Sequence, residues 1–248
     1  DPFLSDFLKH ANSLGLETTI ITNGSLLSEN KCKQLKAAGL RGMQISFHSP
    51  SPDINDQIAQ IPGAYKLTLN GIRTAIKLFG GENITVNMVL TQSNYLQVVE
   101  MARLVKESGG TQISIGALSE TGEAVKEKFI LKREQFQLAY LLLRQAKAEL
   151  GISIGISGGF PICIIAEASD DPLEVVSNYC DAGLNQLVIA PDGDIRACVC
   201  LPHILGNILI DDLQEVWNNN SFLRTLRSLE QVPESCYQCR FVALCKGG

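Results

Sequence analysis

The sequence predicts an α/β protein, with a parallel sheet covered by helices in its first part and a smaller cysteine-rich region after it. Between residues 17 and 117, short apolar runs rich in β-branched residues alternate with longer amphipathic stretches. This alternation is typical of βα units with buried parallel strands. Seven of the eight cysteines follow residue 160, where the alternation has stopped. We therefore expect a domain boundary near residue 158.

Four apolar runs bounded by turn residues are the predicted strands of the first part: Thr18–Thr22, Met43–Phe47, Ile84–Leu90 and Gln112–Ile115. Amphipathic patterns predict the helices between them, at Leu27–Ala38, Tyr65–Phe79 and Tyr95–Ser108. Ser28 is the expected N-cap of the first of these helices. A longer helix, Lys132–Leu150, and a strand, Ile152–Ile156, follow.

The loops after the carboxyl ends of the strands are where we expect ligands, because parallel α/β folds bind them there. These loops cover residues 23–25, 48–50, 91–94 and 118–122. His48 opens the second loop and has a possible functional role. The other two histidines, His10 and His203, are expected at the surface.

Composition excludes several classes of protein. The chain has 248 residues, 45% of them hydrophobic, which is enough for a sizeable core. Its net charge of −5, with acidic and basic residues interspersed, gives no basic face for nucleic acid. We expect no signal peptide, and no apolar run approaches the roughly 20 residues of a membrane span. We expect a cytoplasmic protein that contacts no membrane, and a fragment, because it begins at Asp1 without methionine.

The cysteine spacing favours metal binding. Disulfides would need an oxidising compartment, and a redox-active pair at Cys236 and Cys239 would not explain a third cysteine, Cys245, six positions further on. Two intervening residues let the sulfurs of Cys236 and Cys239 face one metal centre. Zinc sites and iron–sulfur clusters both use such spacings, so this loop alone does not separate them.

A predicted hairpin lies between Cys180 and Cys198. Its strands cover Gln186–Ala190 and Asp194–Ala197, and Asp192-Gly193 is a tight-turn signal. An amphipathic stretch, Leu213–Leu229, follows. Cys200 would share one face of an extended strand with Cys198, where packing is favoured over ligation. Cys32, on an early helix, is expected to be a small packing residue.

The complete pattern, Cys180-x12-Gly193-x4-Cys198 and then Cys236-x2-Cys239-x5-Cys245, resembles the SPASM domain of radical S-adenosylmethionine enzymes. The segments 205–208 and 213–217 match the usual linker between its cysteine groups. The resemblance implies that residues 159–248 bind up to two auxiliary [4Fe–4S] clusters. Cys180 and Cys198 would ligate the first cluster, with Cys163 as a possible further ligand. Cys236, Cys239 and Cys245 would ligate the second. A further cysteine of each set is expected beyond residue 248.

The first part resembles the same family. Asp1-Pro2 match the end of its Gly-Gly-Glu/Asp-Pro motif, Asn23 and Ser46 match the ends of its third and fourth strands, and residues 87–94 resemble its fifth strand. The resemblance implies a partial (β/α)6 barrel over residues 1–158 that binds S-adenosylmethionine through Asp1, Asn23, Ser46 and Asn87. It identifies no catalytic residue.

Two departures from the family pattern stand out. The sequence has no Cys-x3-Cys-x2-Cys loop for the catalytic [4Fe–4S] cluster. We expect that loop before residue 1, so that this chain alone would be inactive. The family also often has an aspartate where His48 stands and an arginine where Ala59 stands.

The resemblance implies that the complete protein is an enzyme that uses a 5′-deoxyadenosyl radical to modify a substrate. That substrate would be a peptide or protein side chain, as in peptide and sulfatase maturases, and an electron donor such as flavodoxin or ferredoxin would be required. The alternative is a non-enzymatic cytoplasmic scaffold whose cysteine loops bind zinc. It explains Cys236-x2-Cys239 but not the matches in the first part.

Overall fold

A computed structural model describes residues 2–119, 129–157, 160, 162–168, 180–230 and 232–247. Its larger sheet has five parallel strands in the order β1-β2-β3-β4-β5. The strands are β1 (Thr19–Thr22), β2 (Gly42–Ser46), β3 (Ile84–Leu90), β4 (Gln112–Ala117) and β5 (Ser153–Ser157). The five strands predicted from sequence are confirmed, with ends that move by two residues or fewer.

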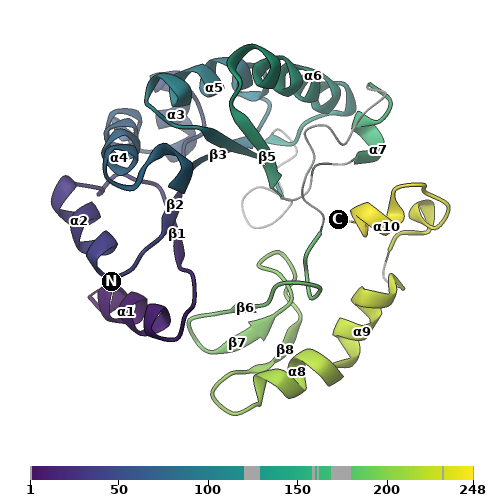
Figure 1. Ribbon diagram of the computed structural model, residues 1–248. Coiled ribbons are helices and arrows are strands. Elements are labelled where there is room, and N and C mark those ends of the chain that lie inside the picture. Colours follow the sequence, from purple (N-terminus) through teal and green to yellow (C-terminus); the bar gives the residue numbers. More distant parts are fainter. Residues whose placement is uncertain are drawn as a thin grey trace.

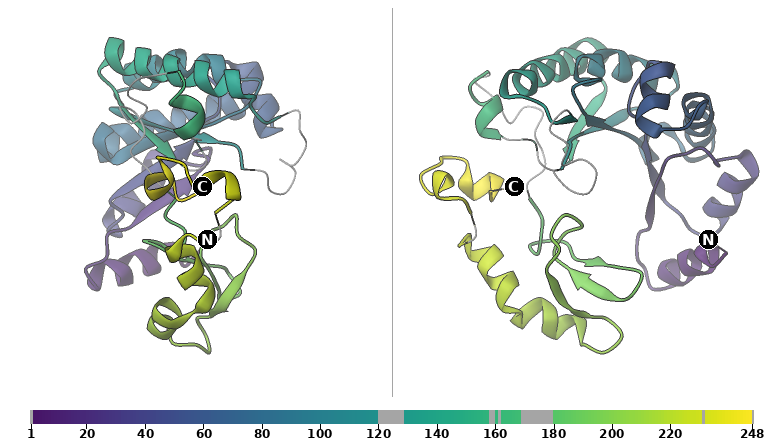
Figure 2. Two further views of the ribbon diagram at one scale, coloured as in Figure 1. Left: turned by 90° about the vertical axis from the view of Figure 1, so that its right-hand side faces the viewer. Right: turned by 180° about the vertical axis from the view of Figure 1, so that it is seen from behind.

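The first region is curved, with the helices on its outer side and the strands of the sheet on its inner side (Figures 1 and 2). The helices are α1 (Leu4–Ser13), α2 (Glu29–Ala37), α3 (Pro52–Ala59), α4 (Ala64–Phe79), α5 (Val98–Glu107), α6 (Arg133–Leu150) and α7 (Ile162–Ile165). Short 3-10 turns at Gly81–Asn83 and Tyr95–Gln97 precede β3 and α5. The strand order and the curved arrangement match the expected partial barrel.

The predicted N-cap of α2 is confirmed, because the Ser28 hydroxyl accepts a hydrogen bond from the backbone N–H of Lys31 at 3.2 Å. The sequence pattern missed α3 as a separate helix. Pro52 begins it, and Gln60 ends it in a left-handed conformation with φ 56°. A proline is well suited to a first helical turn, where its missing N–H leaves no bond unmade.

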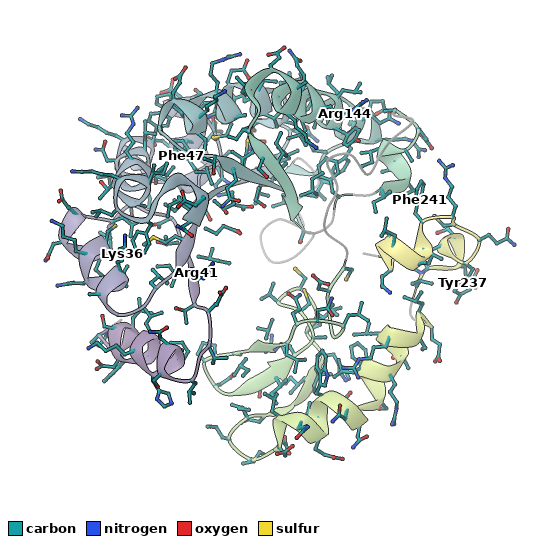
Figure 3. The ribbon with its side chains drawn as sticks, in the orientation of Figure 1. Lys36, Arg41, Phe47, Arg144, Tyr237 and Phe241 are labelled. Carbon is teal, nitrogen blue, oxygen red and sulfur yellow. The ribbon has the colours of Figure 1, made fainter. Side chains whose placement is uncertain are left out.

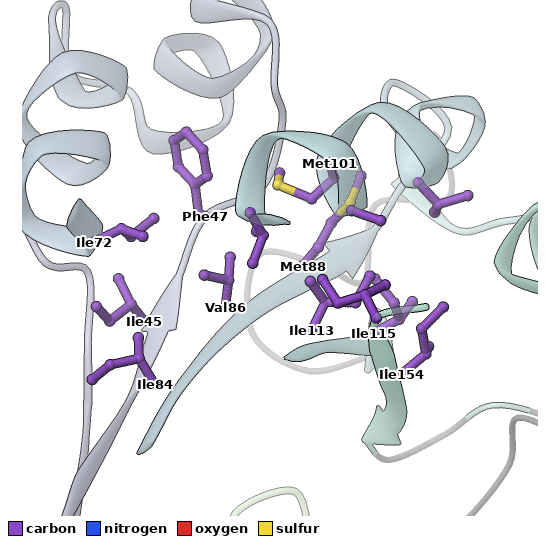
Figure 4. Close-up of a cluster of buried hydrophobic side chains, with 14 of the residues drawn as sticks. Ile45, Phe47, Ile72, Ile84, Val86, Met88, Met101, Ile113, Ile115 and Ile154 are labelled. Atoms are coloured by element: carbon purple, nitrogen blue, oxygen red, sulfur yellow. The ribbon is translucent and has the colours of Figure 1, made fainter. Parts of the chain in front are cut away.

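The main core lies between the sheet and these helices. β3 and β4 are its centre, because both are buried over most of their length. Figure 4 shows isoleucine, valine and methionine side chains of four strands meeting those of α4 and α5. The near-continuous apolar strands predicted from sequence therefore reflect a sheet in which most positions face other parts of the protein.

The second region contains a small antiparallel sheet, β6 (Val188–Ile189), β7 (Asp194–Arg196) and β8 (Ile204–Asn207), in that order. The predicted hairpin is confirmed. Gly193 in its turn has φ 91°, a backbone conformation that favours glycine. A Cβ there would also lie 2.7 Å from the Asn207 side chain, which is too close. Residues 205–207, within the segment expected to connect the two cysteine groups, form most of β8.

The single amphipathic stretch predicted at Leu213–Leu229 is two helices, which corrects that prediction. They are α8 (Leu213–Asn219) and α9 (Ser221–Ser228). Asn220 separates them, because its side chain accepts hydrogen bonds from the N–H groups of Phe222 and Leu223 and caps α9. An asparagine side chain competes with the backbone in this way and starts a new helix.

The C-terminal segment returns to the main core. A 3-10 turn at Glu234–Cys236 leads to α10 (Val242–Cys245), where Phe241, Leu244 and Cys245 pack against the core behind the large sheet. In Figures 1 and 2 this segment lies next to α7. Figure 3 locates Tyr237 and Phe241 on it. The two predicted domains therefore share apolar contacts, and the boundary at residue 158 stays a prediction.

Within the described residues, no helix has both the length and the apolar character that crossing a membrane requires.

Candidate functional site

Two of the predicted cofactor-binding residues, Asn23 and Ser46, line one hollow at the carboxyl ends of β1 and β2. The hollow has a volume of about 260 Å³. Apolar side chains of α3, of the loop after it and of α4 line its other side, Ala59 among them. The polar side chains that line it are Asn23, Ser25, Ser46, His48, Asn55 and Thr68. A polar edge facing an apolar wall is the usual form of a small-molecule site.

The loop after β1 is fixed to α4. Thr68 on α4 donates a hydrogen bond from its hydroxyl to the Asn23 carbonyl at 2.9 Å. The Asn23 side-chain oxygen accepts hydrogen bonds from the N–H and the hydroxyl of Ser25. A Cβ at Gly71 would lie only 2.1 Å from the Gly24 carbonyl oxygen, so a glycine on α4 lets the helix approach this loop.

His48 is held by three neighbouring residues. Its Nδ1 accepts a hydrogen bond from the Val89 N–H at 3.3 Å, and its own N–H donates to Asn55 Oδ1 at 3.1 Å. Asn94 Nδ2 donates to the His48 carbonyl at 2.7 Å. Burial lowers the pKa of His48, because the charged imidazolium would lose its hydration. The imidazole in this hollow is therefore neutral near pH 7.

The other two predicted cofactor-binding residues do not line this hollow. Asn87 is buried within β3, where it pairs in register with Ser46 of β2. Asp1 lies outside the described residues. The roles assigned to these four residues from the resemblance stay predictions. Of the loops expected to hold ligands, the last, 118–122, lies mostly outside the described residues.

Sequence reasoning missed Asn55 and Thr68 as lining residues. Thr68 follows Ala64 and precedes Ile72 at four-residue spacing, and all three are buried on one face of α4. A polar residue at a core-facing position is the signal that could have identified it. Asn55 is buried on α3, a helix that the sequence pattern did not separate from its surroundings, so its orientation was not predictable.

None of the eight cysteines forms a disulfide in the described part of the chain. Cys32 is buried in the main core on α2, as expected for a packing residue, and burial raises the pKa of its thiol. Cys163 is exposed on α7.

Three cysteines line a second hollow, beside the small sheet. Cys180, Cys198 and Cys200 surround it together with apolar side chains of α9 and with Lys246 and Gly247, and its volume is about 330 Å³. The predicted geometry of Cys200 is wrong. It lies in a turn beyond the end of β7 and is exposed, so it is neither on a strand face with Cys198 nor a packing residue. Its N–H instead donates to Cys198 Sγ at 3.4 Å.

The other three cysteines lie together in the sequence at the C-terminus, and each is half-buried. Cys236 closes a 3-10 turn, and Cys245 ends α10. Cys239 Sγ accepts a hydrogen bond from the Phe241 N–H at 3.4 Å. The same arrangement, a sulfur accepting from the N–H two residues later, is found at Cys198. Such amide donors stabilise thiolates and tune the potentials of iron–sulfur clusters.

Within the described residues, no three histidine, cysteine, aspartate or glutamate side chains converge with the geometry of a metal ion site. Metal binding is coupled to the folding of the ligand loops, because a preformed site rarely exists in the unfolded state. The donors nevertheless fit an iron–sulfur cluster by their chemistry. They are thiols, the sulfurs of Cys198 and Cys239 accept amide hydrogen bonds, and three of the cysteines line an apolar hollow. The cluster ligands assigned from the resemblance stay predictions.

The remaining histidines are at the surface, as expected. His10 is exposed on α1. His203 is also exposed, and its ring stacks on Phe222 with centroids 4.0 Å apart. Asp192 stabilises the predicted hairpin turn, because its carboxylate accepts a hydrogen bond from the Asp194 N–H at 3.3 Å.

Comparison with protein families gives two matches. Residues 2–105 match the radical SAM superfamily, and residues 180–240 match SPASM, an iron–sulfur cluster-binding domain. The first match contains the hollow at β1 and β2. The second contains five of the six cysteines beside the small sheet and at the C-terminus, all except Cys245.

Related proteins cover nearly the whole chain. An AdoMet-dependent heme synthase of Methanosarcina barkeri is 23% identical over 99% of the chain and 73% of its own length. A PqqA peptide cyclase of Ruegeria pomeroyi is 26% identical over the full chain and 65% of its own length. The chain thus spans about two thirds to three quarters of the length of these relatives.

Two solved structures share the fold. Streptococcus suis SuiB bound to the precursor peptide SuiA has a TM-score of 0.77 at 18% identity, covering 98% of this chain and 57% of that one. The enzyme anSMEcpe with bound AdoMet has a TM-score of 0.69 at 19% identity, covering 94% and 65%. The chain therefore carries two domains of known families: residues 2–105 belong to the radical SAM superfamily, and residues 180–240 belong to the SPASM iron–sulfur cluster-binding domain.

Proposed function

We propose that the chain is part of a radical S-adenosylmethionine enzyme that modifies a peptide substrate. One observation carries the proposal: the same chain brings Asn23 and Ser46 to a hollow at the carboxyl ends of two parallel strands and places free cysteines around a separate hollow beside the small sheet. The first arrangement suits a small organic cofactor, and the second suits a thiol-ligated cluster.

In this proposal the residues of the first hollow bind and orient S-adenosylmethionine. Asn23 and Ser46 present hydrogen-bonding groups from the ends of rigid strands, and the apolar wall from α3 and α4 excludes water. When bound with its cluster, the cofactor supplies the radical chemistry that removes a hydrogen atom from the substrate. The chain itself provides position and a dry environment for that chemistry.

The cysteines would hold auxiliary [4Fe–4S] clusters. We assign Cys180 and Cys198 to one cluster, and Cys236, Cys239 and Cys245 to the other. Cys163 is a weaker assignment, because α7 exposes it and it is not among the residues that line the hollow of Cys180 and Cys198. We also propose that residues 1–158 and 159–248 are the two domains, and that a small electron-transfer protein such as flavodoxin or ferredoxin reduces the enzyme in the cytoplasm.

A peptide is the substrate class that the relatives favour. The PqqA cyclase acts on a peptide by its name, and both SuiB and anSMEcpe have been solved with peptides bound. The heme synthase relatives raise a second class, a precursor of heme. The two classes differ in the test that follows, because a peptide would be recognised by its backbone amides and a heme precursor by its large apolar ring.

The first test is metal content. The chain is purified without oxygen and reconstituted with iron and sulfide, and its iron, sulfide and zinc are then measured together with its visible absorbance. The proposal expects iron and sulfide with broad visible absorbance, reduced in Cys239→Ser and unchanged in Cys32→Ala. Cys32 is a matched control because it is a cysteine buried in the main core that belongs to neither set.

Stoichiometric zinc without visible colour would overturn the proposal and leave the zinc-binding scaffold. Equal loss of iron in Cys239→Ser and Cys32→Ala would show that the iron is bound nonspecifically. Once clusters are present, candidate peptides and porphyrin precursors are titrated separately against the reconstituted chain. Tight binding of porphyrins alone would replace the peptide as the substrate class.

A further inference from the structure

The hollow beside the small sheet is lined by thiols and apolar side chains. Cys180, Cys198 and Cys200 are the residues on its wall that ligate metals in proteins, and Lys246 is the one charged residue there. Its volume of about 330 Å³ is far above the roughly 30 Å³ that one water molecule occupies in the liquid. The hollow is therefore suited to a group of several atoms that thiolates bind, with a lysine to offset their negative charge.

Cys200 reaches the hollow through a tight turn that begins at Cys198. The Cys198 carbonyl accepts a hydrogen bond from the Leu201 N–H at 3.2 Å, which closes a β-turn over residues 198–201. Inside this turn the Cys200 N–H donates to Cys198 Sγ at 3.4 Å. The first and third residues of the turn are thus both cysteines, and both line the hollow.

The cysteine group at the C-terminus contains the same turn. The Cys239 carbonyl accepts a hydrogen bond from the Val242 N–H at 3.0 Å, and Cys239 Sγ accepts one from the Phe241 N–H at 3.4 Å. Amide donors of this kind stabilise the sulfur ligands of iron–sulfur clusters. The two turns differ in their third residue, which is Phe241 in one and Cys200 in the other. The turn at Cys198 therefore offers a thiol that its counterpart lacks.

A cluster suits this hollow better than a single metal ion. Tetrahedral zinc binds sulfur at about 2.3 Å, which places the ligand sulfurs about 3.8 Å from one another. Within the described residues, no three ligating side chains come together in the manner that one ion requires. In a [4Fe–4S] cluster each thiolate binds a different iron atom, so the sulfurs stay further apart around a larger group. Three cysteines that line one hollow without converging on a point fit the second arrangement.

We propose that Cys200 is a ligand of the auxiliary cluster that Cys180 and Cys198 bind. Two thiolates fill half of the four ligand positions of a [4Fe–4S] cluster, and Cys200 fills a third. Cys163, the alternative for that position, is exposed on α7 and is not among the residues that line the hollow. The inference deepens the proposed function and rests on it, because an iron–sulfur cluster is taken as the occupant.

Protection of the thiols from alkylation tests the proposal in the unaltered full chain. The chain is prepared without oxygen, with and without reconstituted iron and sulfide, and is treated briefly with iodoacetamide. Mass spectrometry of its peptides then gives the alkylation rate of each cysteine. Cys200 and Cys163 are a matched pair, because both are exposed and only Cys200 of the two lines the hollow.

Iron loading should slow the alkylation of Cys180, Cys198 and Cys200 by about tenfold or more, because a sulfur bonded to iron is no longer a free nucleophile. The rate at Cys163 should not change. The iron content of two variants separates ligation from simple shielding. Cys200→Ala should lose up to the iron of one cluster, about four atoms per chain, whereas Cys163→Ala should keep all of its iron. Both residues are exposed, so neither substitution removes buried packing.

Three results would overturn the proposal: unchanged alkylation of Cys200 beside a protected Cys198, protection of Cys163 in its place, or full iron content in Cys200→Ala. Each would leave the proposed function intact, because the cluster would still be present. A chain that binds no iron and protects none of its cysteines would refute the cluster and the ligand together. Protection by zinc alone would overturn the proposed function and retain Cys200 as a ligand of a different metal.

Discussion

The barrel region and the cysteine-rich region bury very different amounts of apolar side chain. The core behind the large sheet joins strands β2 to β5 to helices α1, α2 and α4 to α7. Among the described residues, five buried ones cluster around the small sheet: Ala182, Ile195, Ala197, Leu205 and Leu223. A core of that size supplies little stabilisation, and domains built this way usually depend on metals or covalent links. The barrel can fold on its packing, whereas the second region needs further support.

Some of that support is visible in Arg227 of α9. Its Nε donates to the Gly183 carbonyl at 2.9 Å, its Nη1 donates to the Trp217 carbonyl at 2.8 Å, and its guanidinium lies 4.3 Å from the centre of the Trp217 ring. One side chain thus connects α9 to the end of α8 and to the loop before β6. Polar and stacking contacts replace part of the apolar packing that the barrel has in abundance.

Metal removal should give the largest separation between the two regions. If clusters hold the cysteine-rich region together, removing the metal with a chelator should increase the rate of amide hydrogen exchange over residues 180–230 many-fold. The amides of β3 and β4 should stay protected. Hydrogen exchange followed by mass spectrometry measures both regions in one sample. Equal protection of residues 180–230 with and without metal would show that the small core is sufficient by itself.

Deleting a core side chain sharpens the same comparison. Ile113 in β4 and Leu223 in α9 are 1% and 0% exposed. Ile113→Ala should destabilise the barrel by about 2–5 kcal/mol. Leu223→Ala removes one of those five buried residues and should abolish cooperative unfolding of the small region without changing the barrel transition. Urea unfolding followed by Trp217 fluorescence and by far-UV circular dichroism distinguishes the two, since Trp217 is the only tryptophan and lies in the small region.

Arg227 provides a smaller effect in the region that depends on it. Arg227→Lys should destabilise the small region by about 1–3 kcal/mol, because lysine keeps the charge but cannot make both hydrogen bonds while stacking on Trp217. Arg224→Lys is the control, since Arg224 is an exposed arginine on the same helix. Equal stability of the two variants in urea unfolding would contradict the role given to Arg227.

The smallest effect concerns the barrel and depends on pH. Burial lowers the pKa of His48 in the folded chain, while the unfolded chain keeps a value of about 6.5. Below that pH the unfolded state takes up a proton that the folded state does not, so stability should fall as pH decreases below about 6.5. His48→Gln should flatten this part of the pH profile of the barrel unfolding midpoint. A profile identical to that of the parent chain would mean that His48 is not the responsible group.

The sequence identified the barrel strands because buried parallel strands leave an unmistakable apolar pattern, and β3 was predicted to the residue. It missed features that depend on one side chain acting locally. Asn220 divides a continuous amphipathic pattern into two helices, and Pro52 begins a short helix that has no long periodicity. Periodicity reports which face is buried, and it does not report a cap in the middle of a favourable pattern.

The candidate site divides in the same way. Motif matches identified Asn23 and Ser46, which line the same hollow in the structure. They did not indicate that Asn55 and Thr68 also line it, because this depends on how α3 and α4 pack against the loops. The cysteine spacing identified the family, yet the conformation of Cys200 depended on the turn after β7. Spacing along the chain constrains which residues can meet a metal and leaves their directions open.

Cys245 belongs to both regions at once, as a predicted cluster ligand that also packs against the barrel core. A cluster that ligated it would tie the free energy of metal binding to the docking of α10, and the two equilibria would then be thermodynamically linked. Oxidative loss of the metal would loosen the C-terminal segment from the barrel, and undocking of that segment would weaken metal affinity by the same factor. Through the half-buried sulfur of Cys245, oxidation of the cluster would thus change how tightly the C-terminal segment is docked on the barrel.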